Sequence, residues 1–400
     1  MKKIGILTFH SSINNGAVMQ CYSLSKQLQK LFPNTSVEVV DYNMPTIEKH
    51  YGTFLRRYFC GGSFPVKVKR LIFGILHYGE FRWEQKRAKA FRSVRNMLPL
   101  SPEKIASDDP APLFAYLNAR YDIVVAGSDA IWNYNSRGFP NPYFLDDGIS
   151  CAKLSYAASC YGMNYESVPQ AHKEKIKQIL DSYRFLGVRD GESEKFASHM
   201  GCAQQTVHTC DPTVFLDVND LPVDEQALKE KLTRKGFDFS RPTIGIMGNY
   251  QMCDMVRQMY GKQYQIVSLY NYCKNADVNL HDLTPYEWAF VFRYFKVTFT
   301  TFFHGTMLSL RNGTPVICIA LETAYSKSHM TKVEDFLLRV DLRDCYFRTD
   351  YKTKNLQEIK CKADELLAKD CKADICARMD KEALTSKPFF DKIAEILEEE

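Results

Sequence analysis

A histidine and a glycine stand where an apolar run passes into a helical pattern, in KVTFTTFFHGTMLSLRNGTPVICIA (residues 296–320). The run 297–303 has the β-branched and aromatic composition of a buried strand, and His304 ends the stretch directly after it. Gly305 allows a ligand to approach the backbone closely, and Thr306 lies near the expected helix start. A histidine titrates near neutral pH and can move protons, although a lone histidine is more often structural.

Basic residues suggest that this histidine would act on an anion. Arg311 lies in the same helical pattern, and Lys327 follows the next apolar run. Arg189 ends another strand pattern, in GVRDGES, where its planar fork would suit a phosphate or a carboxylate. A surface ion pair between Arg189 and Asp190 is the alternative. Together the cations and helix N-termini suit a ligand that carries both groups, and the lack of clustered carboxylates predicts no metal site.

The turn FHSSINNGAVMQ also follows a predicted strand. Asn14, Asn15 and Gly16 indicate a tight turn or a helix cap, whose N–H groups could hold an anion. The spacing matches neither the dinucleotide fingerprint nor a P-loop, so ATP and nicotinamide cofactors lose their main support.

Two further strand ends carry polar residues. Ser128 and Asp129, in AGSDAIWN, indicate either ligand contacts or a cap for the next helix, while Trp132 is expected in the core. Asp211 precedes Pro212 in CDPTVFL, where a turn-forming Asp-Pro is the simpler interpretation.

Strand-length apolar runs alternate with longer amphipathic stretches, which predicts an α/β fold with parallel sheets. The predicted strands form two sets: residues 3–9, 36–43, 122–129, 154–161, 185–190 and 206–212, and then 243–249, 264–271, 296–302 and 314–320. We therefore expect two Rossmann-like domains facing a cleft, with ligands beyond the carboxyl ends of the strands.

The charged stretch after DPTVFLDVNDLP is expected to separate the two domains. The first domain would span residues 1–225 and the second 226–370. A C-terminal helix, 371–400, would pack back on the first domain. A basic and aromatic insertion, 49–97, would belong to the first domain.

This insertion carries a charge of +10 between Lys49 and Arg95, where twelve cations face two glutamates, while the rest of the chain is −5. Aromatic residues are interleaved with the cations. Such a segment suits anionic lipid headgroups or a pyrophosphate-bearing acceptor, and a solvated helical face is the plainer interpretation. Nucleic acid is not expected as a partner, because the rest of the chain is acidic and has no recognition motif.

Thirteen cysteines without CxxC pairs predict reduced thiols that mostly fill the core. The chain begins with two lysines and a strand-like run in place of a secretory signal, and no apolar run approaches the roughly 20 residues of a membrane span. A cytoplasmic protein is therefore expected, with peripheral contact at the inner face of the membrane through the basic insertion.

The sequence resembles the polysaccharide pyruvyl transferase family in six motifs, which occur in the family's order: NNGAVMQCYSL, DIVVAGSDAIWN, LSYAASCYG, GVRD, DPTVFL and FFHGTMLSLRNGTPVI. They cover the chain from about residue 4 to 335. The resemblance implies two Rossmann-like domains arranged as in GT-B glycosyltransferases. It also implies transfer of a pyruvate ketal from phosphoenolpyruvate, a co-substrate and not a cofactor, to two hydroxyls of a sugar in a bacterial surface polysaccharide.

Motif positions suggest roles within this chemistry. His304 would be the acid and base, and Asp211 would orient it or an acceptor hydroxyl. The second domain would be the donor side, and the donor would contact Lys327, Gly305, Thr306 and Arg311 there and Arg189 of the first domain. The saccharide acceptor, on a lipid carrier or free, would lie on the first domain, against Asn14, Asn15, Gly16, Ser128 and Asp129.

The chain departs from the family pattern at two positions. Ala130 stands where the family commonly has Gln, and Phe302 stands where it commonly has Ser before the FHG motif. The loss of the serine hydroxyl would change how one phosphate oxygen of the donor is bound. A GT-B glycosyltransferase that uses a nucleotide sugar is the alternative enzyme, and a non-catalytic polysaccharide-binding partner of an export complex is the alternative of another class.

Overall fold

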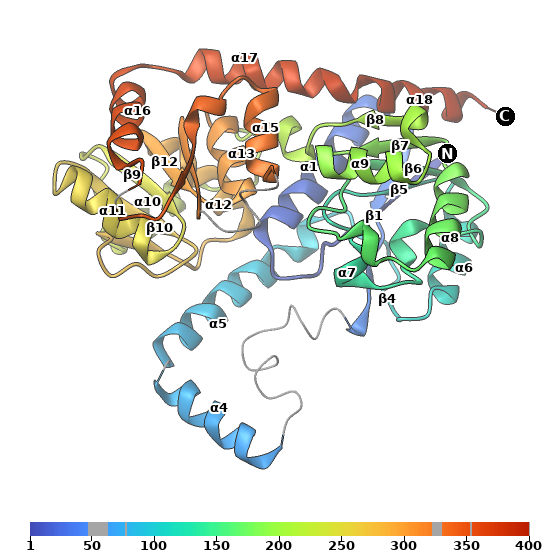
Figure 1. Cartoon of the computed structure of the whole chain (residues 1–400), viewed down its shortest axis with the longest axis horizontal. Coiled ribbons are helices and arrows are strands. Elements are labelled where there is room, and N and C mark those ends of the chain that lie inside the picture. Colours follow the sequence, from blue (N-terminus) through green and yellow to red (C-terminus); the bar gives the residue numbers. More distant parts are fainter. Residues whose placement is uncertain (47–62, 77, 322–329, 353, 400) are drawn as a thin grey trace. The chain divides into compact units, whose positions relative to one another are not determined.

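The apolar runs form two parallel sheets, one in each of two units of the chain (Figure 1). The computed structural model describes residues 1–46, 63–76, 78–321, 330–352 and 354–399. Unit 1 comprises Met1–Ile72, Ser93–Phe215 and Ala383–Glu400, and unit 2 comprises Phe73–Arg92 and Leu216–Glu382. The chain thus crosses between units twice inside the basic segment, after Ile72 and after Arg92. It crosses a third time after Phe215, ten residues before the expected boundary at residue 225, and a fourth time after Glu382.

The main sheet of unit 1 has six parallel strands in the order β2-β1-β5-β6-β7-β8. In that order the strands are Ser36–Val39, Lys3–Leu7, Ile123–Ala126, Ala152–Ala158, Phe185–Val188 and Thr206–His208. The predicted strand 36–43 is divided, since β3 (Tyr42–Asn43) leaves the main sheet and pairs with β4 (Ile105–Ala106).

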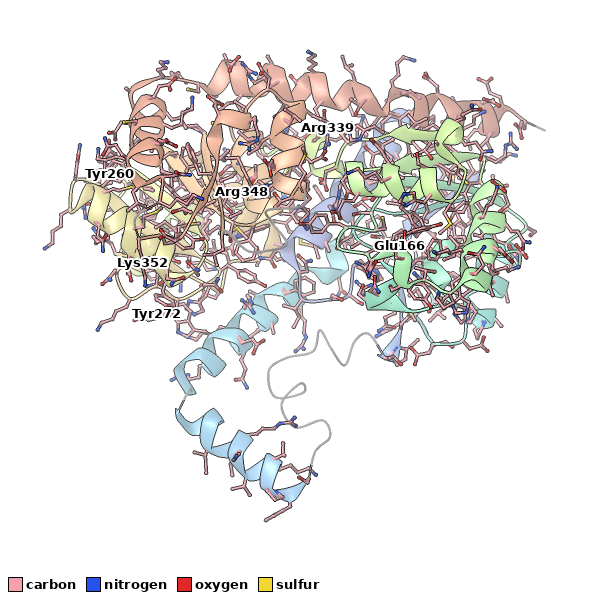
Figure 2. The ribbon with its side chains drawn as sticks, viewed as in Figure 1. Glu166, Tyr260, Tyr272, Arg339, Arg348 and Lys352 are labelled. Atoms are coloured by element: carbon pink, nitrogen blue, oxygen red, sulfur yellow. The ribbon has the colours of Figure 1, made fainter. Side chains whose placement is uncertain are left out.

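The sheet of unit 2 also has six parallel strands, in the order β11-β10-β9-β12-β13-β14. In that order they are Val278–Leu280, Gln265–Leu269, Thr243–Met247, Val297–Thr300, Val316–Leu321 and Tyr346–Thr349. The two edge strands escaped the sequence analysis because they are short and partly polar. In β14, Arg348, labelled in Figure 2, pairs with Glu334 at 2.7 Å.

Helices follow most of the strands and bury their apolar faces on the sheets, as expected for doubly wound units. In unit 1 they are α1 (Asn15–Leu31), α6 (Ala111–Arg120), α7 (Tyr134–Arg137), α8 (Gln170–Asp181), α9 (Gly191–His199), α18 (Lys387–Glu398) and the 3-10 turn η5 (Pro212–Phe215). In unit 2 they are α10 (Glu225–Arg234), α11 (Tyr250–Tyr260), α12 (Pro285–Phe290), α13 (Phe303–Arg311), α15 (Lys332–Arg339) and α16 (Leu356–Ala368). Three helices begin or end near a division between the units: α4 (Phe64–Leu76), α5 (Tyr78–Ser93) and α17 (Lys372–Ala383).

Each unit has its own apolar core. In unit 1, Trp132 is 1% exposed, which confirms its predicted place in the core. It stacks on Phe144 with ring centroids 5.6 Å apart. The C-terminal helix α18 adds Phe389, which packs edge-on against Tyr156 of β6 and Phe185 of β7. Eight of the twelve cysteines that the structure describes are buried, which agrees with their expected place in the core.

Strand order locates the point in each sheet where ligands are expected. In unit 1 the chain moves outward from β1 to β2 and then returns to β5 on the other side. In unit 2 it moves from β9 to β10 and β11 and then returns to β12. At such a reversal the connections after the two central strands diverge and leave room for a ligand beyond their carboxyl ends. We call these places the β1/β5 switch point and the β9/β12 switch point.

Candidate functional site

The predicted asparagine turn lies at the β1/β5 switch point and caps α1. The side-chain oxygen of Asn14 accepts from the backbone N–H of Gly16 at 3.0 Å and of Ala17 at 3.4 Å. Asn15 and Gly16 are buried in the first turn of the helix. The cap interpretation is thus confirmed, and two N–H groups that could hold an anion are instead bound by Asn14.

The backbone after β5 has an unusual conformation beside this turn. Gly127 has φ +131°, and a Cβ there would come within 1.9 Å of the carbonyl oxygen of Tyr156. Asp129 has φ 83°, a conformation uncommon for non-glycine residues that recurs at functional sites. The hydroxyl of Ser128 is buried and has no hydrogen-bond partner within the described part of the chain. A buried polar atom of this kind calls for an explanation, and a ligand group or a water would supply one.

Arg189 lies at the end of β7 and is 1% exposed. Its Nη1 donates to Asp211 at 3.0 Å, and its Nε lies 3.7 Å from a carboxylate oxygen of Asp190. Burial alone would lower the pKa of the guanidinium, but the carboxylates of Asp211, Asp190 and Asp129 raise it above its ordinary value. The alternative of a surface ion pair is therefore wrong, because the pair is buried.

Asp211 accepts hydrogen bonds on both oxygens. Oδ2 receives Gln20 Nε2 at 2.6 Å as well as Arg189, and Oδ1 receives the backbone N–H and the hydroxyl of Thr213 at 3.0 and 2.6 Å. The bonds to Thr213 make the turn that the Asp-Pro pair predicted. Asp211 thus joins α1, β7 and η5. Its role in orienting His304 or an acceptor hydroxyl stays a prediction.

Asp190 extends this network. Its side chain caps α9 by accepting from the N–H and the hydroxyl of Ser193, and its other oxygen accepts from the hydroxyl of Ser159 at 2.6 Å. The ends of β6 and β7 are therefore fixed by buried polar contacts around one arginine.

His304 lies at the β9/β12 switch point, in the first turn of α13. Its side chain is half-buried. The N-cap of α13 is Phe302, which offers no side-chain hydrogen bond to the helix within the described residues. The neighbouring helix α11, which follows β9, is capped by Asn249. Because the first N–H groups of a helix carry partial positive charge, the start of α13 can receive an anion beside the histidine.

Gly305 lets α13 pack on the strand ends. A Cβ at this position would lie 2.4 Å from the hydroxyl of Thr300 and 2.9 Å from the sulfur of Met247. These residues end β12 and β9. The glycine predicted for close backbone approach therefore serves first to seat the helix that carries His304.

The other residues predicted for the donor are placed differently. The hydroxyl of Thr306 is buried and donates to the carbonyl of Phe302 at 3.2 Å. Arg311 lies in the last turn of α13, about 10 Å along the helix from His304, where it donates to the carbonyl of Leu216 and pairs with Asp380 at 3.2 Å. The structure therefore does not bring Arg311 to the start of α13. Lys327 lies outside the described residues.

Some polar residues at these edges were missed by the sequence analysis. Gln20, in the second turn of α1, binds Asp211. His10 follows β1 and is buried, with its Nε2 3.1 Å from Asp41. In unit 2, Arg87 of α5 stacks over the ring of Tyr270, which follows β10, at 4.1 Å. His10 could have been found by taking every polar or aromatic residue that directly follows a predicted strand. Tyr270 lies near the end of the predicted strand 264–271, so this rule would not have selected it.

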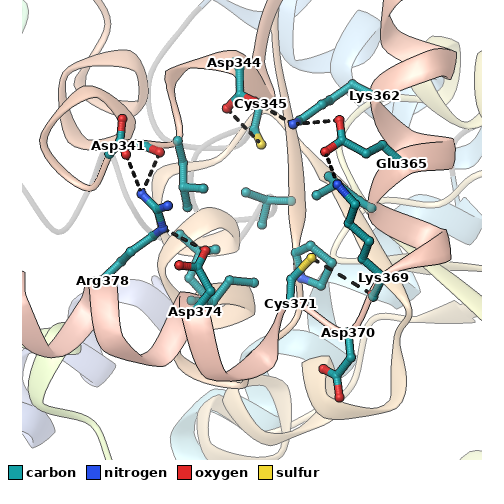
Figure 3. Close-up of a pocket in the computed structure, with 16 residues that line it drawn as sticks. Asp341, Asp344, Cys345, Lys362, Glu365, Lys369, Asp370, Cys371, Asp374 and Arg378 are labelled. Atoms are coloured by element: carbon teal, nitrogen blue, oxygen red, sulfur yellow. Dashed lines mark hydrogen bonds and ion pairs between the residues drawn. The ribbon is translucent and has the colours of Figure 1, made fainter.

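Two cavities lie at the amino ends of the strands, which is the sheet edge opposite the switch points. In unit 2 a cavity of about 480 Å³ borders Val316, at the amino end of β13, and helices α16 and α17 (Figure 3). Its cations are all held in ion pairs: Lys362 with Asp344 and Glu365, Lys369 with Glu365, and Arg378 with Asp341 and Asp374. In unit 1 a hollow of about 810 Å³ borders Asp122 and Ala152, where β5 and β6 begin. Neither cavity contains a residue predicted for the reaction.

Comparison with known proteins identifies a family and a fold. The profile of the family described as Polysaccharide pyruvyl transferase matches residues 14–323. No curated protein matches the chain. Two solved structures resemble it along nearly their whole length. One is a UDP-GlcNAc 2-epimerase from Neisseria meningitidis bound to UDP-GlcNAc, 8% identical, which covers 99% of this chain and 100% of its own with a TM-score of 0.54.

The second is a UDP-GlcNAc 2-epimerase from Methanocaldococcus jannaschii, 8% identical, which covers 93% of this chain and 94% of its own with a TM-score of 0.51. At such identities the likeness concerns the fold alone. The prediction of a GT-B-like α/β fold with two Rossmann-like units is confirmed.

Proposed function

The chain belongs to the polysaccharide pyruvyl transferase family, and we propose that it transfers the pyruvyl group of phosphoenolpyruvate to two hydroxyls of one saccharide, as a cyclic ketal. Membership of the family makes the chain a pyruvyl transferase that acts on a polysaccharide. The donor, the ketal product and the residues that act are our proposal.

The start of α13 is the observation that carries this proposal. A half-buried histidine stands at the switch point of unit 2 on a helix whose N-cap, Phe302, supplies no side-chain oxygen within the described residues. Phosphoenolpyruvate carries a phosphate and a carboxylate, which the partial positive charge of this helix start would attract. His304 then lies where it can exchange a proton with the bound donor.

The reaction needs protons to move in both directions. Protonation of the vinyl carbon of phosphoenolpyruvate makes the neighbouring carbon electrophilic, and one sugar hydroxyl attacks it. The second hydroxyl then displaces phosphate from the same carbon. Each of the two sugar hydroxyls loses a proton. One of these protons balances the proton that the vinyl carbon gained when it became a methyl group, and the other leaves with phosphate. One residue that cycles between acid and base therefore suffices. His304 fits this role, which is worth typically about 10²–10⁴ in rate.

Unit 1 supplies the most suitable groups for the acceptor. Ser128 has a buried hydroxyl with no partner among the described residues. The next residue, Asp129, carries a carboxylate whose Oδ1 accepts from the N–H of Ala130 at 2.7 Å. These two groups can bind sugar hydroxyls. Arg189 and Asp211 hold the strand ends beside them in place, and a direct contact of Arg189 with the donor remains our prediction from the family motif.

The test is phosphate release from phosphoenolpyruvate with a panel of β-galactosides and lipid-linked saccharides. We expect release that depends on the acceptor, and a fall of about 10²–10⁴ in rate for His304→Ala. His199→Ala is the matched control, because this histidine is exposed at the end of α9. It should react like the wild type.

Two outcomes would replace the proposal. Tight, saturable binding of a UDP- or GDP-sugar without phosphate release would favour the glycosyltransferase alternative. If phosphoenolpyruvate does not bind in calorimetry, and Arg189→Ala and His304→Ala retain function in the cell, a non-catalytic partner protein is the better description.

A further inference from the structure

Helix α4 has one apolar face that is exposed. Val66, which is 38% exposed, lies apart from this face. Four other apolar residues recur at positions i, i+4, i+7 and i+8, which places them on one side of the helix. Their exposed fractions are 79% for Phe64, 40% for Val68, 52% for Leu71 and 53% for Ile72. Because burying such side chains is favourable, a helix that exposes four of them on one side indicates a surface that binds something.

The polar side of α4 identifies the chemistry of that partner. Lys67 and Lys69 are exposed and lie on either side of the apolar face, and Arg70 lies on the opposite side of the helix. The helix contains no acidic residue. An apolar face flanked by lysines is typical of helices that lie in a membrane interface, where the lysine ammonium groups reach lipid phosphates while their stems cover apolar surface.

The neighbouring helix α5 is also basic, but its Trp83 packs against residues of unit 2. Trp83 stacks on His281 of unit 2 with ring centroids 3.5 Å apart, and it meets Tyr272, labelled in Figure 2, edge-on at 4.8 Å. Its cations Lys86 and Lys89 remain exposed. The basic segment therefore has one helix anchored to a folded unit and a preceding helix whose apolar face is exposed.

The length of α4 decides how it meets a bilayer. Thirteen residues rise about 20 Å, less than the roughly 30 Å hydrocarbon core. Among the described helices, none combines the length and the apolar character that a membrane crossing requires. A helix of this kind lies in the plane of the interface.

We propose that α4 is a membrane-docking helix, which inserts Phe64, Val68, Leu71 and Ile72 into the headgroup region of an anionic bilayer and holds its surface through Lys67 and Lys69. The charge of the helix selects this occupant, since an anionic lipid surface offers both the negative charge and the apolar layer that the two sides of α4 require. Docking would bring the enzyme to saccharides carried on a lipid. It does not depend on the reaction that the enzyme performs.

The test is co-sedimentation of the full chain with vesicles of phosphatidylcholine containing about 30% phosphatidylglycerol, and with pure phosphatidylcholine vesicles. Three double variants are compared with the wild type: Leu71→Asp with Ile72→Asp, Lys67→Glu with Lys69→Glu, and Lys104→Glu with Lys195→Glu. The last pair is the matched control, because it makes the same change of charge at exposed lysines outside α4. Far-UV circular dichroism and thermal unfolding verify that each variant is folded.

We expect the apolar pair to lose at least about tenfold in partition coefficient, and the charge-reversed pair at least about 25-fold, since each lysine near an anionic surface is worth about fivefold. The control pair should keep most of the wild-type binding. Added salt should weaken the binding of the wild-type protein to the anionic vesicles. Equal binding by all variants would overturn the proposal. So would a wild-type dimer that the Leu71→Asp, Ile72→Asp pair dissociates, without vesicle binding, because the face would then belong to a second copy. No phosphoenolpyruvate is present, so the result is separate from that of the phosphate-release assay.

Discussion

The two switch points have the same strand topology but opposite polar organisation. At the β1/β5 switch point the helix α1 is capped by Asn14, and nearby Asp211 and Arg189 are buried in mutual contacts. At the β9/β12 switch point α13 begins after Phe302 without a side-chain cap in the described residues, and His304 is only half-buried.

This difference shows how one fold divides its work. Buried, paired charges lose their hydration, and their mutual contacts fix the backbone segments that carry them. They therefore build a surface of fixed shape. An uncapped helix start keeps its positive potential for a partner that arrives from outside. We therefore assign positioning mainly to the buried network of unit 1 and binding of the anionic donor to the start of α13. The following predictions test that division.

The largest expected effect is on stability, from Arg189→Ala. The change leaves Asp211 and Asp190 buried without their cation, which should lower the free energy of unfolding of unit 1 by about 3–5 kcal/mol. Urea unfolding measures it. Arg184→Ala is the matched control at the other end of β7, because Arg184 is 42% exposed and pairs with Glu399 at the surface. It should cost less than about 1 kcal/mol. Unchanged stability in Arg189→Ala, with loss of activity, would instead make Arg189 a ligand-binding group.

The next effect concerns the seat of α13. Gly305→Ala places a methyl group against Thr300 and Met247, and overpacking of this kind costs about 1–3 kcal/mol. Thr300→Ala removes the nearest atom, so Gly305→Ala should cost less in that background. A double-mutant cycle by urea unfolding gives the coupling. Simple additivity would show that the contact with Thr300 does not position α13.

The smallest effect is a pH dependence confined to unit 2. Burial lowers the pKa of His281 to about 4, from the usual 6.5. Between these two pH values the unfolded chain binds a proton at this histidine that the folded chain does not bind. The stabilisation is complete above about pH 6.5 and is lost as the pH falls toward 4. Thermal unfolding between pH 7 and pH 4.5 should show a larger decrease in midpoint for the wild type than for His281→Phe. Equal decreases would show that His281 is not the group responsible.

Periodicity and composition predicted ten of the twelve strands of the two main sheets, because most of these are apolar runs that need no partner to be recognised. The edge strands β11 and β14 are short and partly polar and were missed. The strand β8 is equally short and polar, and it was predicted only as part of the longer segment 206–212. The place of α5 in unit 2 depends on another kind of contact. The stacking of Trp83 on His281, which brings α5 to unit 2, joins residues far apart in the chain.

The candidate site was predicted unevenly. Asn14, Ser128, Asp129 and His304 were chosen because each follows a predicted strand or ends one, and the structure places all four at the carboxyl edge of a sheet. Arg311 was chosen by its nearness in sequence to His304, but seven residues along a helix separate the two by about 10 Å. The choice of Asp211 gave no sign of Gln20, because a hydrogen bond across 191 residues depends on how α1 packs.

The most direct test of the division between the switch points is a calorimetric titration of phosphoenolpyruvate into three proteins: the wild type, Phe302→Asp and Asn14→Asp. Both variants place an aspartate at the N-cap of a switch-point helix. An aspartate at position 302 would supply the side-chain cap that Phe302 lacks and add a negative charge at the start of α13, so affinity should fall at least about tenfold. Asn14→Asp should bind like the wild type. Unchanged affinity in Phe302→Asp, with loss in Asn14→Asp, would place the donor at the β1/β5 switch point and contradict the account.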